Sequence, residues 1–128
     1  MSRAVLDTSV FVAVEQAREL RVPLPDEAAV SVVTLAELET GVLAARDEAT
    51  RAIRLRTLVA VRERVTGLPV DQRVASAYAG LAAAALRAGR RPRIHDTWIA
   101  ATAIVHESAV WTQDADFGDF EGVEIVAV

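Results

Sequence analysis

The sequence contains no cysteine and no lysine, and it has only two histidines. Without cysteine the chain has no thiol nucleophile, no disulfide and no cysteine-based zinc site, and two histidines alone cannot supply a histidine-rich one. Without lysine it has no Schiff-base chemistry and no lysine for a Walker-type phosphate-binding loop. All 14 basic residues are arginine, a bias typical of GC-rich genomes. These exclusions hold whatever the cause of the bias.

Long hydrophobic runs are also missing, although 52% of the 128 residues are hydrophobic. The longest apolar stretches, YAGLAAAAL and WIAATAIV, fall well short of the roughly 18 residues of a membrane span. The first apolar run begins almost at once and leaves no room for a signal peptide, so we expect a cytoplasmic protein. The length suits one domain with a substantial core, and we predict a single domain over residues 1–128.

Strand-like and helix-like apolar patterns alternate along the chain. Short apolar or β-branched runs predict strands at residues 3–6, 28–33, 67–70, 109–112 and 123–128. Helical spacing predicts helices from residue 8 or 9 to 19, and at 35–45, 47–64, 71–88 (ended by Gly89) and 96–106. Loops are expected at 21–27, 90–93 and 113–122. This alternation predicts a three-layer α/β/α fold with a central parallel sheet of about five strands.

Acidic residues follow the predicted strands. Asp7 comes directly after the first strand, Glu37 comes after the second in SVVTLAEL, and Asp114 and Asp116 come after the fourth in VWTQDADF. Asp96 opens the last predicted helix in IHDTWIAATA. Ligands of open parallel sheets bind outside the carboxyl ends of the strands. We therefore expect these acids to project toward the same rim.

Each acid also has an ordinary structural explanation. Thr34 and Glu37 have the spacing of a capping box, and for this pair taken alone we favour that explanation. Asp7 and Asp96 fit N-caps, or first-turn acids that face the positive end of a helix dipole. The two acids after the fourth strand fit turn residues of a polar loop.

Taken together, the acids favour a functional explanation. Two carboxylates about 5 Å apart repel by roughly 3 kcal/mol at an effective dielectric constant of 20, and four acids make six such pairs. Asp96 also shares a helical stripe with Ile99, Ala100 and Ala103, which should face the core. No lysine can neutralise the group. Either the acids stay apart or a divalent cation holds them, and oxygen ligands of this kind suit Mg²⁺ or Mn²⁺ in phosphate chemistry.

Four segments of the chain resemble the PIN-domain ribonucleases, and most closely the VapC-type toxins of bacterial toxin-antitoxin pairs. The segments are VLDTSV, VTLAEL, HDTWIAATA and WTQDADF, which occur in the family's order and together cover almost the whole chain. The resemblance implies that the catalytic and metal-binding acids are Asp7, Glu37, Asp96 and Asp114, with Asp116 as a further ligand that varies among related sequences. It also implies supporting hydroxyls at Thr8, Ser9 and Thr112.

The resemblance implies an endoribonuclease that uses Mg²⁺, with Mn²⁺ as the alternative, to hydrolyse RNA phosphodiester bonds without a side-chain nucleophile. It further implies three partners: RNA, with tRNA among the candidates, a VapB-type antitoxin that covers the active site, and a second copy in a homodimer. Apolar side chains available for such contacts are Val10, Phe11 and Val14 in the first predicted helix and Leu55, Leu58 and Val59 in the third.

The formal net charge of −4 argues against binding of nucleic acid by bulk charge alone. Two divalent ions would bring the formal charge to about zero, and local arginine clusters would then carry RNA binding. Arg90, Arg91 and Arg93 lie just ahead of Asp96 and suit an RNA backbone, or equally an exposed helix end. The arginines at 46, 51, 54 and 56 are interpreted as a solvated helix face, and His95 is left out of catalysis.

Two other functions remain open. One is a non-catalytic PIN-like module that binds metal or a protein partner, which the loss of one of the four acids would favour; none is lost. The other is a metal-dependent phosphatase for a small molecule, which calls for a deep, closed pocket instead of an open groove. The sequence does not distinguish these shapes.

Overall fold

The structure is a computed structural model that describes residues 3–118 and 120–128. Met1, Ser2 and Asp119, which belong to the predicted domain and in the last case to the predicted loop 113–122, lie outside the described residues. The elements in chain order are β1 (Arg3–Leu6), α1 (Thr8–Glu15), β2 (Glu27–Ser31), α2 (Val32–Leu43), α3 (Glu48–Arg64), β3 (Thr66–Leu68), α4 (Gln72–Arg87), α5 (Ile94–Val105), β4 (Ala109–Thr112) and β5 (Ile125–Ala127). No helix in the described ranges is long and apolar enough to cross a membrane.

The five strands form one parallel sheet in the order β3-β2-β1-β4-β5, which confirms the predicted fold class. β1 lies in the middle and pairs with β2 on one side and β4 on the other. In this register Val5 faces Ala29 and Val110. Central strands of such a sheet are covered on both faces, which explains why Ala4, Val5 and Leu6 are all buried.

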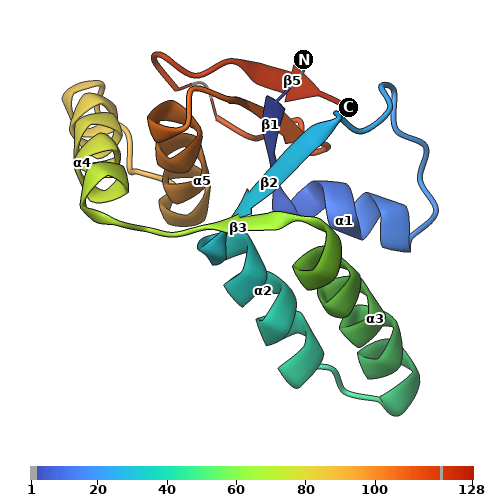
Figure 1. The fold of residues 1–128 in the computed structure, drawn as a ribbon. Helices are drawn as coiled ribbons and strands as arrows, with labels where there is room; N and C mark the ends of the chain where they lie inside the picture. Colours follow the sequence, from blue (N-terminus) through green and yellow to red (C-terminus); the bar gives the residue numbers. More distant parts are fainter. Residues whose placement is uncertain (1–2, 119) are drawn as a thin grey trace.

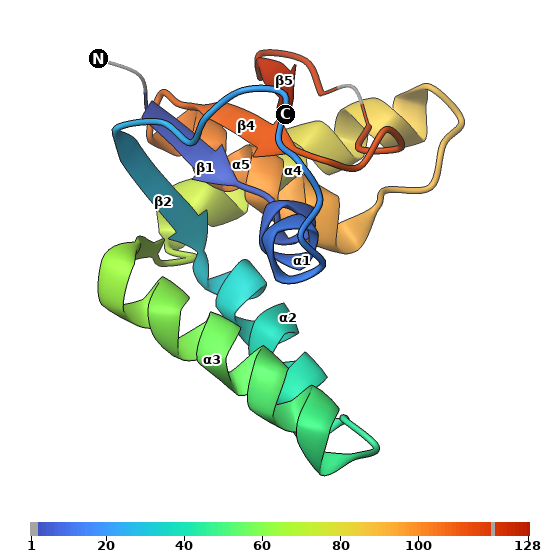
Figure 2. The same ribbon diagram turned by 90° about the vertical axis from the view of Figure 1, so that its right-hand side faces the viewer.

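Helices cover both faces of the sheet (Figures 1 and 2). Side chains alternate along β1, so that Ala4 and Leu6 pack in a core cluster with Val10 and Phe11 of α1. Val5 points to the opposite face and packs with Ile99 of α5 in a second cluster. The antiparallel pair α2 and α3 extends beyond the sheet as an arm (Figure 2).

Two element boundaries differ from the prediction for identifiable reasons. α1 ends at Glu15 instead of residue 19, because Ala17 adopts a left-handed conformation (φ 55°) and the Arg18 N–H bonds back to the Ala13 carbonyl at 2.8 Å. No glycine marks this end. α2 begins at Val32 instead of residue 35, because the Ser31 hydroxyl accepts the Val33 N–H and so caps a helix that opens on β-branched residues.

Other boundaries lie within a few residues of their predicted positions. α5 starts at Ile94, two residues early, and β3 and β5 are shorter than predicted. The predicted end of α4 at Gly89 is confirmed: Gly89 has φ 73°, its N–H bonds to the Leu86 carbonyl, and the Arg90 N–H bonds to the Ala85 carbonyl. This pattern is the Schellman motif, which needs a residue in the left-handed region.

We predict that Asp71→Ala lowers the free energy of unfolding by about 1 kcal/mol. Asp71 is the N-cap of α4, and its Oδ1 accepts the Val74 N–H at 3.0 Å. Asp71→Asn keeps an acceptor oxygen and should lose much less. Urea denaturation of the three proteins provides the measurement, and equal losses for both variants would contradict this role of the cap.

Candidate active site

The carboxyl ends of β1 and β4 lie side by side in the sheet, and the strands that follow each of them in the chain lie on opposite sides of this pair. From β1 the order continues outward to β2 and β3, whereas β4 continues to β5 on the other side. The two ends are joined by a hydrogen bond of 2.9 Å from the Asp7 N–H to the Trp111 carbonyl. A crevice outside such a switch point is the usual ligand site of an open α/β sheet.

Asp7 lies buried at the carboxyl end of β1 and is held by two hydroxyls. Its Oδ2 accepts hydrogen bonds from Ser9 Oγ at 2.7 Å and from Thr112 Oγ1 at 2.8 Å. Asp7 takes the N-cap position of α1, but its side chain caps no backbone N–H, so the predicted capping role is wrong for its carboxylate. The N–H groups of Gln113 and Asp114 donate to the same two hydroxyl oxygens, at 2.9 and 3.0 Å. The loop after β4 therefore fixes the orientation of Asp7.

Glu37 lies in α2 and approaches the crevice from the side. Its Oε1 accepts the Thr8 hydroxyl at 3.0 Å, and its Oε2 lies 3.5 Å from His95 Nδ1. The capping-box explanation is wrong, because Ser31 caps α2 and Thr34 is fully buried with its hydroxyl 3.3 Å from that of Thr8. Thr34, interpreted from the sequence as a cap, and His95, left out of catalysis there, thus both lie beside the Thr8–Glu37 pair.

Asp96 lies in the first turn of α5, two residues inside the helix start. The Arg93 guanidinium lies 3.1 Å from its Oδ2, yet this oxygen is buried and accepts no hydrogen bond. The pKa of the Asp96 carboxyl is raised to about 6, chiefly by burial. The charges of Asp7, Asp114 and Glu37 contribute to this rise, and the charge of Arg93 opposes it. Four carboxylates from four parts of the chain therefore act on one another electrostatically.

The two acids after β4 differ in their surroundings. Asp114 is half-buried, and its Oδ1 accepts the Asp116 N–H at 2.8 Å in a turn. Asp116 is exposed. Of this pair, the charge on Asp114 is the one that acts on Asp96, whereas Asp116 fits the role of a turn residue.

The acids fit a divalent cation in their chemistry, but they do not form a closed ligand set. Within residues 3–118 and 120–128, no three acidic or histidine side chains lie close enough together to hold a metal ion. The buried Oδ2 of Asp96 accepts no hydrogen bond and has the Arg93 guanidinium 3.1 Å away. The charges of three other carboxylates act on Asp96, and a cation would relieve this repulsion. Oxygen donors of this kind suit Mg²⁺ or Mn²⁺. Binding would have to draw the carboxylates closer together.

The arginines near the site have separate roles. Arg93 pairs with Asp96, whereas Arg90 and Arg91 are exposed. Arg54 does not belong to a solvated helix face as predicted: it is half-buried and donates to the Gly41 carbonyl at 2.8 Å. It lines a small crevice of about 240 Å³ together with Thr8 and Glu37.

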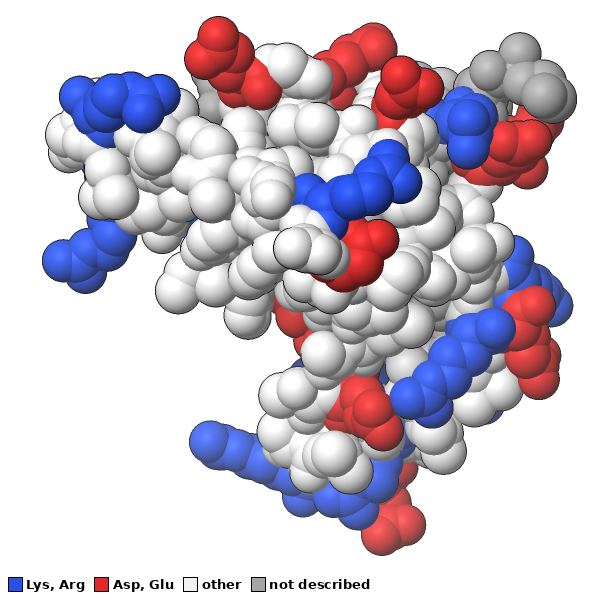
Figure 3. Space-filling view, turned by 60° about the vertical axis from the view of Figure 1, so that its left-hand side comes forward, with Lys and Arg blue, Asp and Glu red and all other residues white. Residues whose placement is uncertain are grey.

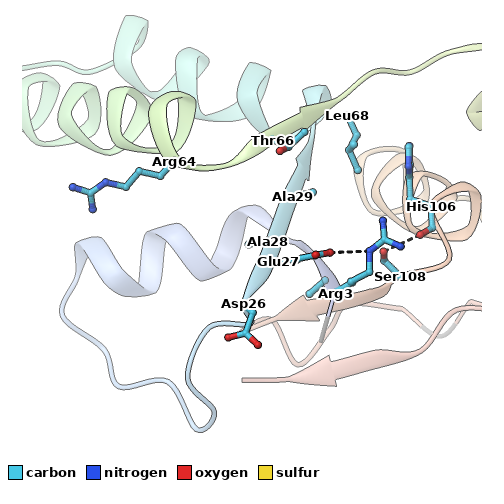
Figure 4. Close-up of a pocket in the computed structure, with 11 residues that line it drawn as sticks. Arg3, Asp26, Glu27, Ala28, Ala29, Arg64, Thr66, Leu68, His106 and Ser108 are labelled. Atoms are coloured by element: carbon cyan, nitrogen blue, oxygen red, sulfur yellow. Dashed lines mark hydrogen bonds and ion pairs between the residues drawn. The ribbon is translucent and has the colours of Figure 1, made fainter. Parts of the chain in front are cut away.

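A recess of about 360 Å³ also lies at the opposite edge of the sheet (Figure 4). It is lined by the amino ends of β1 and β2, where Arg3 pairs with Glu27 at 3.2 Å. The four interacting carboxylates are absent from its lining among the described residues. The region at the carboxyl ends of the strands is therefore the candidate active site.

The chain matches a known protein family and several known proteins over most of its length. The family model of the PIN domain matches residues 4–123. The chain is 50% identical over 128 residues to Ribonuclease VapC5 of Mycobacterium tuberculosis, with 97% of this chain and 94% of the relative covered. It is 40% identical to Ribonuclease VapC4 of the same species over 131 residues, with 98% and 97% covered.

Solved structures show the same fold. A crystal structure of a member of the VapBC family of toxin-antitoxin systems, VapBC-5 from Mycobacterium tuberculosis, matches with a TM-score of 0.88 and 45% identity, over 100% of both chains. The structure of VapBC2 from Rickettsia felis bound to a promoter DNA fragment matches with a TM-score of 0.80 and 18% identity, over 98% of both chains. The second likeness concerns the fold alone.

The raised pKa of Asp96 predicts an unusual pH dependence of stability. Between the ordinary value of 3.8 and about 6, the folded protein binds more protons at this carboxyl than the unfolded chain, so stability falls as pH rises through this window. Asp96→Asn should therefore raise the free energy of unfolding by up to about 3 kcal/mol at pH 7 and change it little at pH 4.

Urea denaturation at both pH values, without divalent cations, tests this expectation. The exposed Asp116→Asn removes one acidic charge nearby and is the matched control, for which we expect little change at either pH. A loss of stability in Asp96→Asn at pH 7 would show that the ion pair with Arg93 outweighs the burial of the charge.

Proposed function

Since the chain belongs to the PIN-domain family and to its VapC-type members, we propose that it is a metal-dependent endoribonuclease that acts as the toxin of a toxin-antitoxin pair. The proposed reaction is hydrolysis of an RNA phosphodiester bond with Mg²⁺, or alternatively Mn²⁺. The observation that carries the proposal is the convergence of carboxylates on Asp96, whose buried Oδ2 has no hydrogen-bond partner. A site that collects negative charge in this way suits a cation that in turn binds phosphate.

The chain's own residues have distinct roles in this proposal. Asp7 and Asp96 hold the cation, while Glu37 and Asp114 hold a second ion or orient the attacking water. Such an ion supplies Lewis acidity toward the phosphate and a lower pKa for bound water.

The hydroxyls act through these acids. Ser9 and Thr112 keep Asp7 in one orientation, and Thr8 does the same for Glu37. Each of the three donates a hydrogen bond to a carboxylate, and we assign none of them the role of nucleophile. Water is therefore the nucleophile of the proposed reaction.

The shape of the site favours a polymer over a small phosphate ester. The cavities that share Glu37 with the site are a crevice between α1, α2 and α3 and a pocket between α2 and α5. In Figure 3 the outline of the molecule is hollowed between the upper body and the lower arm formed by α2 and α3. An open hollow of this kind supports RNA as the substrate more than it supports the small molecule of a phosphatase.

An apolar groove between α1 and α3 suits the antitoxin. It encloses about 510 Å³ and is lined by Val14 and Leu24, which are 55% and 46% exposed. Three of the apolar residues suggested for partner contact are instead core residues, because Val10, Phe11 and Leu58 are buried. Glu15 lines both this groove and the crevice that contains Glu37. The groove therefore borders, at Glu15, the crevice that contains one acid of the site, and a homodimer is proposed alongside this complex.

The catalytic proposal predicts metal-dependent cleavage. Purified protein incubated with a mixed RNA pool that includes tRNA should cut it with Mg²⁺ or Mn²⁺ and not with chelator. Asp7→Asn and Asp96→Asn should each lower the cleavage rate at least about 100-fold, because each removes a charged metal ligand. The control Asp71→Asn, the same change at the N-cap of α4, should retain most of the activity. Equal cutting by wild type and both site variants would identify a contaminating nuclease, and metal binding without cutting would favour the binding module.

The toxin proposal predicts a tight inhibitor encoded by a short neighbouring reading frame. Its product, when co-expressed, should copurify with this chain and suppress cleavage. Val14→Asp places a charge in the α1–α3 groove and should weaken the complex at least about tenfold, since an unpaired charge is costly to bury. Leu86→Asp on α4, a matched change at an exposed apolar residue outside this groove, should not. Unchanged affinity for Val14→Asp in a titration would rule out this groove.

A further inference from the structure

A pocket between α2 and α5 borders the acidic site. It encloses about 520 Å³ and is lined by Val33, Ala36, Glu37 and Thr40 from α2 and by Ile94, His95 and Trp98 from α5. Glu37 and His95 are shared with the acidic site, where they contact each other at 3.5 Å. The pocket therefore lies beside the acids to which the scissile phosphate is assigned.

The walls of this pocket are apolar and carry an aromatic ring. Trp98 is half-buried, and its indole stacks on Tyr78 of α4 with ring centroids 3.9 Å apart, which holds the ring in place. Ile94, two residues before Asp96, is 60% exposed. A held indole and an exposed isoleucine beside a cluster of acids leave apolar surface open to water next to the proposed chemistry.

The charged groups of the pocket favour the base of a nucleotide over its phosphate. Among the described residues that line it, Glu37 is the only acid and there is no arginine. A phosphate group would meet the carboxylate of Glu37 there and no arginine, whereas a neutral nucleobase gains apolar contact and an aromatic partner. Stacking of bases on aromatic side chains is the usual means by which proteins bind unpaired RNA.

We infer that the α2–α5 pocket binds one nucleobase of the RNA, next to the phosphate that is cleaved. This inference rests on the proposed function and narrows its substrate class. A base can enter the pocket only if it is unstacked and unpaired, so the preferred substrate is a single strand or a loop. Trp98 and Ile94 are the specificity-determining residues of this site.

The test couples a change in the protein with a change in the RNA. A short single-stranded RNA with one mapped cut is compared with copies that carry one abasic residue at each position beside the cut. For one of these positions, wild type should lose about 5- to 150-fold in kcat/KM, the range measured for loss of one stacked base. Ile94→Ser and Trp98→Leu should lower kcat/KM on the intact RNA and cause little further loss on that abasic RNA.

Two controls keep this result specific. Leu86→Ser changes an exposed apolar residue of α4 outside the pocket and should behave as wild type on every RNA. Thermal unfolding checks that the Trp98→Leu protein is folded, and Ile94→Ser carries the test alone if it is not.

Three outcomes would overturn the inference. First, the loss of kcat/KM caused by Ile94→Ser could multiply with the loss caused by the abasic residue at every position of the RNA. This result would show that the base binds elsewhere. Conversion of a dimer to a monomer by Ile94→Ser, with equal losses on all RNAs, would assign the pocket to a contact between copies of the chain. If the wild-type protein cuts no RNA, both the proposed function and the base site are wrong. If it cuts RNA but the effects of the protein and RNA changes are independent, only the base site is wrong.

Discussion

The hydrogen-bonded attachment of Asp7 to the ends of two neighbouring strands is the contact on which the site depends. Ser9 lies in the first turn of α1 and Thr112 ends β4, and both hydroxyls donate to the same carboxylate oxygen. The loop after β4 then donates two backbone N–H groups to those hydroxyls. Strand pairing, the start of α1 and the path of the loop are therefore set by one network, in which each polar group satisfies the next.

Repulsion among the acids is what this framework has to withstand. Asp96 lies at the start of a helix that is mostly buried beyond it, so its carboxyl is held close to the core and only 17% of the side chain is exposed. The raised pKa of Asp96 reflects the cost of keeping a charged carboxylate partly buried next to other carboxylates. Sites that violate local rules of stability in this way are commonly functional. In this chain the violation lies at the edge where ligands of parallel sheets bind.

The sheet and the approximate position of the acids could be predicted from sequence, because alternation of strands and helices dictates a parallel order and brings the carboxyl ends together. The details that failed depend on tertiary contacts or on weak local signals. Ser31 caps α2 although the following valines favour a strand, and Ala17 turns the chain where a glycine would have been expected. Thr34 and His95 join the site only because α2 meets α1 and α5, which no spacing in the sequence encodes.

The division of surfaces around Glu37 explains how an acidic chain can serve a polyanionic substrate. The phosphate is assigned to cations held by the carboxylates, so the protein's own net charge does not need to attract it. The base is assigned to a pocket without arginine, where apolar contact and stacking replace charge as the source of affinity. The partner protein is assigned to a third surface, the α1–α3 groove, which shares Glu15 with the crevice that contains Glu37. In this proposal the substrate and the inhibitor use different surfaces beside Glu37, so a substitution on one surface is expected to alter recognition of one partner and leave the other intact.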